Sequence, residues 1–141
     1  LIVAEDTKCI DTAQLGTTSQ WACILASPLP QGIFMRAWLS SGELDPNLSD
    51  NYNNCDFDGS PWSINLYMFP CFPCGNPAKQ VKDLATALNN LSIYVDYIFI
   101  DIETYQWSSN VQANQAFITT LANTLKAEQI ADVGIYTSRT E

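Results

Sequence analysis

Apolar and polar residues alternate along five short segments of the chain, and each alternation predicts a β-strand. The five segments are residues 8–11, 32–39, 64–69, 97–103 and 132–138. In the second segment one face would hold Ile33, Met35 and Ala37, and the other Phe34, Arg36 and Trp38. Each strand therefore has one aliphatic face and one mixed face of polar and aromatic residues. Such strands fit a barrel with helices outside better than a doubly wound sheet, which is apolar on both faces.

Between these segments, apolar residues recur at the helical spacing, and capping signals precede them. Asp45-Pro46 and Asn76-Pro77 each place a capping side chain before a proline at the first helical position. Gly59 would end the helix that begins at Asp45. The apolar stripes of the last two helices are Val81, Leu84, Ala85, Leu88 and Leu91, then Ala113, Phe117, Leu121 and Leu125. Strand and helix thus alternate along the whole chain.

This alternation predicts an α/β fold in which residues 1–141 form a single domain, a modified β/α barrel of the TIM type. The sequence ends at Glu141, directly after the fifth predicted strand. A closed barrel of eight such units takes roughly 250 residues. The alternatives are an open sheet or a barrel whose C-terminal part is missing from this sequence, and we expect the second.

Composition narrows the possible functions. The formal net charge of −9 and the sequence pI near 4.1 argue against partners bound by attraction to negative charge, such as nucleic acids and anionic membranes. No run of eighteen apolar residues occurs, so we expect no membrane insertion. Histidine is absent, which excludes Ser-His-Asp and Cys-His catalysis and zinc sites built on imidazole. Carboxylates remain as the main acid–base groups.

Asp101 and Glu103 form the leading candidate pair of acids. At strand spacing their Cα atoms would lie ~6.5 Å apart with both side chains on the mixed face. A neighbouring charge and partial burial raise the pKa of one carboxyl, so that one acid holds a proton while the other is ionised. Glycoside hydrolysis is a reaction that uses such a pair. Asp11 ends another predicted strand and would join them, although strand-end acids that simply meet water are the ordinary alternative.

Aromatic residues near the same strand ends could offer flat apolar faces to a sugar ring. The candidates are Tyr67, Phe69, Trp107 and Tyr136, although aromatic residues at strand ends more often belong to the core. We predict that Tyr67 and Tyr136 bind substrate. Arg36 and Phe69, which share the mixed faces, are included as further substrate contacts.

Five cysteines and two sequons, Asn47-Leu48-Ser49 and Asn90-Leu91-Ser92, favour a secreted or lysosomal (phagosomal) protein. The odd count leaves one thiol free or paired outside this sequence. Cys71 and Cys74 have the spacing of a redox motif, but Gly75-Asn76-Pro77 separates them from the next helix. A structural disulfide is therefore favoured over a redox pair, and a metal site is disfavoured because only one such pair exists.

Residues on all five predicted strands together resemble successive landmarks of the glycoside hydrolase family 25 lysozymes. The landmarks are Ile10-Asp11, Arg36-Ala37, Tyr67-Met68-Phe69, Asp101-Ile102-Glu103 and Gly134-Ile135-Tyr136-Thr137-Ser138. Residues 67–71 and 75–81 resemble the cysteine-bearing eukaryotic branch of that family. The resemblance spans nearly the whole chain, although the family usually continues past the fifth strand to supply another acidic residue.

The resemblance implies hydrolysis of the β-1,4 bond between N-acetylmuramic acid and N-acetylglucosamine in bacterial peptidoglycan. Glu103 would be the general acid, Asp101 would stabilise developing positive charge or orient the substrate, and Asp11 would line the same pocket. No metal or organic cofactor is implied, and we expect a monomer. Family 18 chitinases are a weaker alternative because their pattern needs an acid where this chain has Phe99. A sugar-binding protein that keeps the cleft without hydrolysis is the other alternative.

Overall fold

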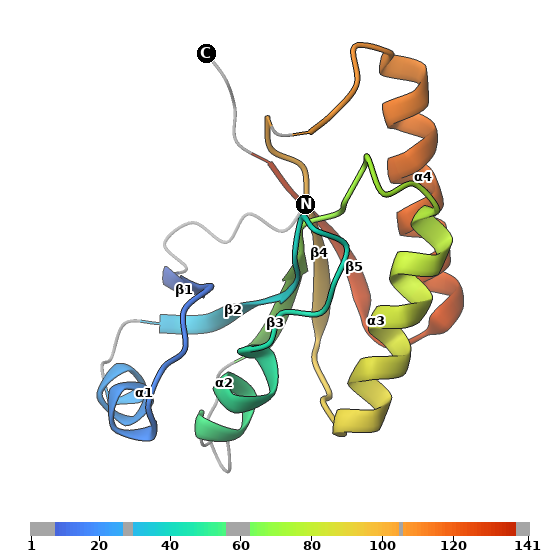
Figure 1. Cartoon of the computed structure of the whole chain (residues 1–141). Helices are drawn as coiled ribbons and strands as arrows, with labels where there is room; N and C mark the ends of the chain where they lie inside the picture. The colour runs from blue at the N-terminus through green and yellow to red at the C-terminus, as the bar shows by residue number, and fades with distance from the viewer. Residues whose placement is uncertain (1–7, 27–29, 56–62, 105, 138–141) are drawn as a thin grey trace.

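The computed structural model describes residues 8–26, 30–55, 63–104 and 106–137, in which strands and helices alternate (Figure 1). The strands are β1 (Lys8–Thr12), β2 (Pro30–Trp38), β3 (Ser63–Met68), β4 (Tyr97–Asp101) and β5 (Asp132–Tyr136). The helices are α1 (Thr18–Leu25), α2 (Leu48–Asn54), α3 (Pro77–Leu91) and α4 (Val111–Glu128). The predicted α/β alternation is confirmed.

All neighbouring strands pair in parallel, in the order β1-β2-β3-β4-β5. Each connection therefore steps to the next strand in the same direction, and right-handed crossovers that step one way place their helices on one face of the sheet. Figure 1 shows α3 and α4 side by side along the sheet, where they pack on one another. The architecture is a partial β/α barrel, as predicted from strands that each have one aliphatic and one mixed face.

The core lies between the aliphatic face of the sheet and the helices. Its buried residues include Ile33, Met35, Leu66, Met68, Ile98 and Ile100 from the strands, and Trp21, Leu48, Val81, Leu84, Leu88, Phe117, Leu121 and Leu125 from the helices. Burying one large aliphatic side chain contributes about 1.5–3 kcal/mol, so this layer holds the helices to the sheet. Leu91 and Ala113, predicted for the helical stripes, are exposed near the helix ends.

The predicted start of α2 at Asp45-Pro46 is wrong, since the helix begins at Leu48 with Asn47 as its N-cap. The buried Asp45 carboxylate lies ahead of the helix. It accepts hydrogen bonds from Arg36 Nε at 2.6 Å and from the Asn47 backbone N–H at 2.8 Å. The predicted stop at Gly59 lies outside the described residues. By contrast, Asn76 caps α3 ahead of Pro77, as predicted.

Trp38 does not lie on the mixed face, where simple alternation placed it. The register of β2 against β3 shifts between Arg36 and Trp38, so that Trp38 pairs with Met68 instead of continuing the side of Arg36. A residue inserted into one strand moves the following side chains to the other face. Trp38 is consequently 3% exposed and belongs to the core.

No helix in the described part of the chain is long and apolar enough to cross a membrane.

Candidate active site

A cavity of about 230 Å³ opens on the sheet face opposite the helices. Its lining residues are Cys9, Asp11, Phe34, Tyr67, Phe99, Asp101 and Tyr136. They come from all five strands, because parallel strands bring the same face of each segment to one surface. Four of them, Asp11, Asp101, Tyr67 and Tyr136, are predicted site residues. Phe34, Phe99 and Cys9 were not proposed as site residues, although strand alternation already placed Phe34 and Phe99 on the mixed face.

Asp101 is the most enclosed acid of the site, with 6% of its surface exposed at the end of β4. Burial first, then the charges of Glu103 and Asp11, raise the pKa of its carboxyl to about 6. Its Oδ1 atom is buried without a hydrogen-bond partner among the described residues. A carboxyl in that setting holds a proton under mildly acidic conditions and keeps an unused acceptor in the pocket.

Glu103 lies beyond the strand that was predicted to carry it. β4 ends at Asp101, and the Ile102 N–H makes one more ladder bond, to the Tyr136 carbonyl oxygen at 2.8 Å. Glu103 is half-buried and is absent from the residues that line the cavity. Its charge nevertheless acts on Asp101. The two acids are therefore neighbours, with Asp101 inside the cavity and Glu103 in the loop that follows.

Asp11 and Tyr67 face one another across the sheet from β1 and β3. Burial, the charge of Asp11 and a hydrogen bond to its side chain raise the pKa of the Tyr67 phenol, against the opposing effect of Arg36. The phenol therefore stays protonated and serves Asp11 as a donor. Asp101 adds to the same shift, so the phenol lies within the field of both carboxylates.

The remaining predicted substrate contacts differ in their placement. Tyr136 lines the cavity with 47% of its surface exposed. Arg36 instead bonds to Asp45 and donates from Nη2 to the Ala13 carbonyl oxygen at 3.5 Å. Phe69 follows β3, is half-buried, and does not line the cavity. Substrate contacts by Arg36 and Phe69 stay predictions.

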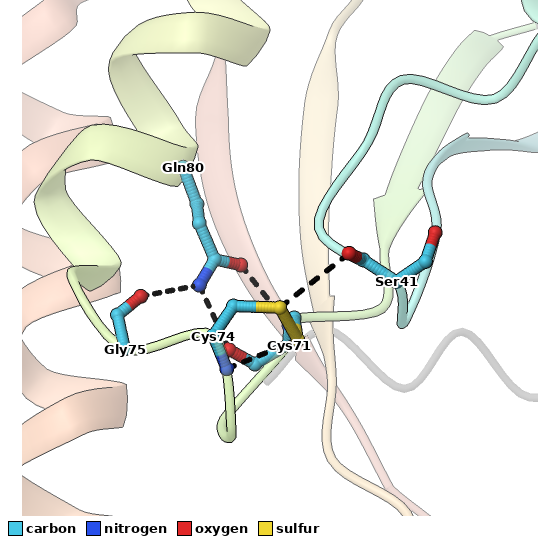
Figure 2. Close-up of a disulfide and its surroundings, with 5 residues drawn as sticks. All are labelled: Ser41, Cys71, Cys74, Gly75 and Gln80. Atoms are coloured by element: carbon cyan, nitrogen blue, oxygen red, sulfur yellow. Dashed lines mark hydrogen bonds between the residues drawn. A yellow bond between two sulfur atoms is a disulfide. The ribbon is translucent and has the colours of Figure 1, made fainter.

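The Cys71–Cys74 pair forms a disulfide, as predicted (Figure 2). Its structural rather than redox role stays a prediction. Gln80 of α3, which is buried, accepts a bond from the Cys71 N–H at 3.0 Å and donates from Nε2 to the carbonyl oxygens of Cys71 and Gly75, both at 2.8 Å. The Cys74 sulfur also contacts the Ser41 carbonyl oxygen at 3.4 Å. The loop after β3 is thereby fixed to α3 and to the loop after β2.

No group of three or more Cys, Asp or Glu side chains within the described ranges is arranged to hold a metal ion. The arrangement offers instead a partly apolar cavity with two acids at its wall, a third acid beside it and a phenol donor between them. Such a set can hold a neutral polar ligand and exchange a proton with it.

Comparison with known proteins gives matches over most of this sequence. The family described as lysozyme-like protein 1 matches residues 3–141. The chain is similar to probable GH family 25 lysozyme 5 of Dictyostelium discoideum, with 31% identity over 134 residues that cover 94% of this chain and 61% of the relative. It is also similar to lysozyme-like protein 5 of Caenorhabditis elegans, with 30% identity over 131 residues that cover 92% of this chain and 60% of the relative. The chain thus spans about three fifths of the length of these relatives.

Among solved structures, the fold is similar to the catalytic domain of endolysin ply40 from bacteriophage P40 of Listeria monocytogenes. The TM-score is 0.64 at 16% sequence identity, and the match covers 92% of this chain and 62% of the other. The similarity supports the partial β/α barrel. Together with the match over residues 3–141, these findings show that the chain belongs to the GH25 lysozyme-like family.

Proposed function

We propose that this protein is a lysozyme that hydrolyses the β-1,4 bond between N-acetylmuramic acid and N-acetylglucosamine in bacterial peptidoglycan. The observation that carries the proposal is the meeting of Asp11 and Asp101 with Tyr67 and Tyr136 in one cavity. The names of the Dictyostelium relatives, probable GH family 25 lysozymes, support the same substrate class.

In this proposal Glu103 donates the proton to the glycosidic oxygen as the bond to the anomeric carbon breaks. Glu103 is the less enclosed member of the acid pair, so it can reach a polymer that lies across the cavity mouth. Asp101, ionised above about pH 6, would stabilise the positive charge that develops on the sugar ring. A water molecule then attacks the anomeric carbon and gives up a proton to the Glu103 carboxylate, which restores the acid. Asp11 helps to position the substrate.

Sugar recognition is assigned to the aromatic surface of the cavity. Phe34 and Phe99 pack edge to face with their ring centroids 5.1 Å apart, and both line the cavity. Tyr67 and Tyr136 add rings with hydroxyl groups. Flat apolar faces beside polar tips suit a pyranose ring, whose axial hydrogens form an apolar patch.

The test is clearing of a suspension of bacterial cell walls by the intact wild-type protein and by Glu103→Gln and Asp101→Asn. Glu43→Gln is the matched control, because Glu43 is an exposed acid in the loop after β2. We expect clearing by the wild type and by Glu43→Gln, and a loss of at least about 100-fold in Glu103→Gln, the scale of general acid catalysis.

Two other outcomes would change the proposal. Clearing that persists in Glu103→Gln but is lost in Asp101→Asn would move the acid role to Asp101. Absence of clearing by the wild type, combined with cosedimentation of the protein with cell walls, would favour a sugar-binding protein without hydrolytic activity.

We further propose that the protein is a monomer that passes through the secretory pathway. The sequon at Asn90 supports the secretory route, since Asn90 is exposed in the last turn of α3. Asn47 is half-buried at the N-cap of α2. Expression in a secreting eukaryotic cell should give a glycosidase-sensitive mass that Asn90→Gln abolishes and the neighbouring Asn89→Gln retains. An unglycosylated secreted product would remove the support that this sequon gives.

A further inference from the structure

The loop that carries Glu103 is closed by a hydrogen bond from the side chain of Trp107. Between the end of β4 and Asn110, the N-cap of α4, the Trp107 Nε1–H donates a hydrogen bond to the Glu103 carbonyl oxygen at 2.8 Å. Gln106, just before Trp107, has a φ of 60°. A left-handed conformation costs a residue other than glycine about 1 kcal/mol or more, so contacts elsewhere must hold this turn in place.

Those contacts come from an aromatic cluster of Phe72, Trp107 and Phe117. The Trp107 ring lies 5.6 Å from Phe72 and 6.1 Å from Phe117, and Phe72 lies 5.0 Å from Phe117, measured between ring centroids. Phe117 of α4 is buried in the core. Tilted and edge-on pairs at these separations are favourable, so the cluster gives the indole a defined position.

The third ring of the cluster belongs to the disulfide loop. Phe72 is one of the two residues enclosed between Cys71 and Cys74. Gln80 engages both the N–H and the carbonyl of Cys71, as Figure 2 shows. The backbone around Phe72 is therefore held by the Cys71–Cys74 disulfide and by the buried amide of Gln80, which bonds to Cys71. A continuous set of contacts runs from the Cys71–Cys74 loop through Phe72 and Trp107 to the backbone of Glu103.

We infer that Trp107 is a positioning residue, which uses the disulfide-braced Phe72 as a fixed support to set the place of Glu103 beside Asp101. The inference rests on the proposed function for its catalytic meaning, but the placement itself can be measured without activity. The inference also assigns a role to the Cys71–Cys74 disulfide, because without it the loop would be more mobile and Phe72 would no longer give the Trp107 ring a fixed packing partner.

The first test is a carbon-13 NMR titration of the Asp101 carboxyl group in the intact protein. The groups that act on it are Glu103 in the following loop and Asp11 on β1, and the Tyr67 phenol of β3 lies in the same field. Since the charge of Glu103 raises the pKa of Asp101, a Glu103 that moves away lowers it. Trp107→Phe removes the N–H and keeps a packed ring, and we expect it to lower the Asp101 pKa measurably.

Trp38→Phe is the matched control. Trp38 is a buried indole whose Nε1 has no hydrogen-bond partner among the described residues, so its loss costs packing only. We expect the Asp101 titration to stay at its wild-type midpoint in Trp38→Phe. An unchanged midpoint in folded Trp107→Phe and Trp107→Ala would overturn the inference.

The second test is kinetic and applies if the wild type clears cell walls. Trp107→Phe should lower kcat about 10-fold with little change in KM, since a slightly misplaced acid affects the reaction more than binding. Phe72→Leu should have the same effect in weaker form. A wild type without activity would reject the proposed function while the titration still decides the inference, whereas an active Trp107→Phe with unchanged kcat would overturn the inference alone.

Discussion

Gly134 of β5 lies directly against the ring of Phe99 on β4, so closely that a Cβ atom at residue 134 would stand 2.3 Å from Phe99 Cε1. The ring of Phe99 also packs on Phe34 and lines the cavity. Glycine is required here by space rather than by backbone conformation. The missing side chain at residue 134 thus sets the position of the cavity's aromatic wall.

Gly134→Ala should therefore push the Phe99 ring toward the cavity and destabilise the protein by about 1–3 kcal/mol, the usual cost of overpacking. Denaturant unfolding measures the stability, and calorimetric titration with an N-acetylated oligosaccharide measures binding, which should weaken. Phe99→Leu in the Gly134→Ala background should recover part of the stability, because the shorter side chain clears the new methyl group.

Gly32→Ala is the control for that substitution. Its Cβ would lie 2.9 Å from Ser63 Oγ, a hydroxyl that can rotate away and give up only its hydrogen bond from Asn65 Nδ2, so we expect a smaller loss than at Gly134. Equal losses of stability in Gly134→Ala and Gly32→Ala would show that the contact of residue 134 with Phe99 does not make Gly134 the more sensitive position.

Asp101→Asn should stabilise the fold at neutral pH. The folded-state pKa of about 6 lies above the usual value of 3.8, so the folded protein binds the proton more tightly than the unfolded chain. The contribution of protonated Asp101 to the free energy of unfolding is complete below about pH 4, and it is lost as the pH rises through 6. The variant should exceed the wild type at pH 7 by on the order of 2 kcal/mol.

The measurement is thermal or denaturant unfolding of both proteins from pH 3.5 to 7.5. The difference between them should shrink as the pH falls and disappear near pH 4. A variant less stable than the wild type at pH 7 would mean that ionised Asp101 is well solvated or well paired.

Arg36→Met should destabilise the protein by about 2–3 kcal/mol, because it leaves the Asp45 carboxylate buried without its charged partner. The Asp45 side chain is 2% exposed and that of Arg36 32% exposed. Lys79→Met is the matched control, since Lys79 and Asp83 form an ion pair on the exposed surface of α3 and such pairs contribute at most about 1 kcal/mol. Similar losses for both variants in denaturant unfolding would contradict a structural role of the Arg36–Asp45 pair.

Gln80→Leu should destabilise the loop after β3, because the N–H and carbonyl of Cys71 would lose their buried partner. Unsatisfied buried polar groups cost about 1–3 kcal/mol each. Hydrogen exchange at the Cys71 amide should accelerate strongly in this variant. Gln115→Leu, at an exposed position of α4, should leave both the exchange rate and the stability unchanged. Continued protection of the Cys71 amide in Gln80→Leu would mean that the disulfide alone holds the loop.

Local patterns in the sequence were enough to determine the elements and their order. The alternation in residues 97–101 makes a strand in any setting that buries one face, and Asn76-Pro77 starts a helix through its own side chains. These signals act between residues close in the chain, where geometry is set by the backbone. The same alternation placed Tyr67, Asp101 and Tyr136 on one face, and all three line the cavity together with Asp11, which was predicted to end the first strand.

Only the tertiary structure decided which groups meet. The bulge that turns Trp38 into the core arises where β2 must match β3, and the partner of Arg36 lies nine residues away in a loop. The support of Glu103 by Trp107 depends on Phe72 and Phe117, which arrive from two other segments. Contacts of this kind depend on how separately formed elements pack, and neither periodicity nor capping carries that information. The sequence by itself therefore determined the sheet and the face that bears the acids, and packing decided how each acid is held.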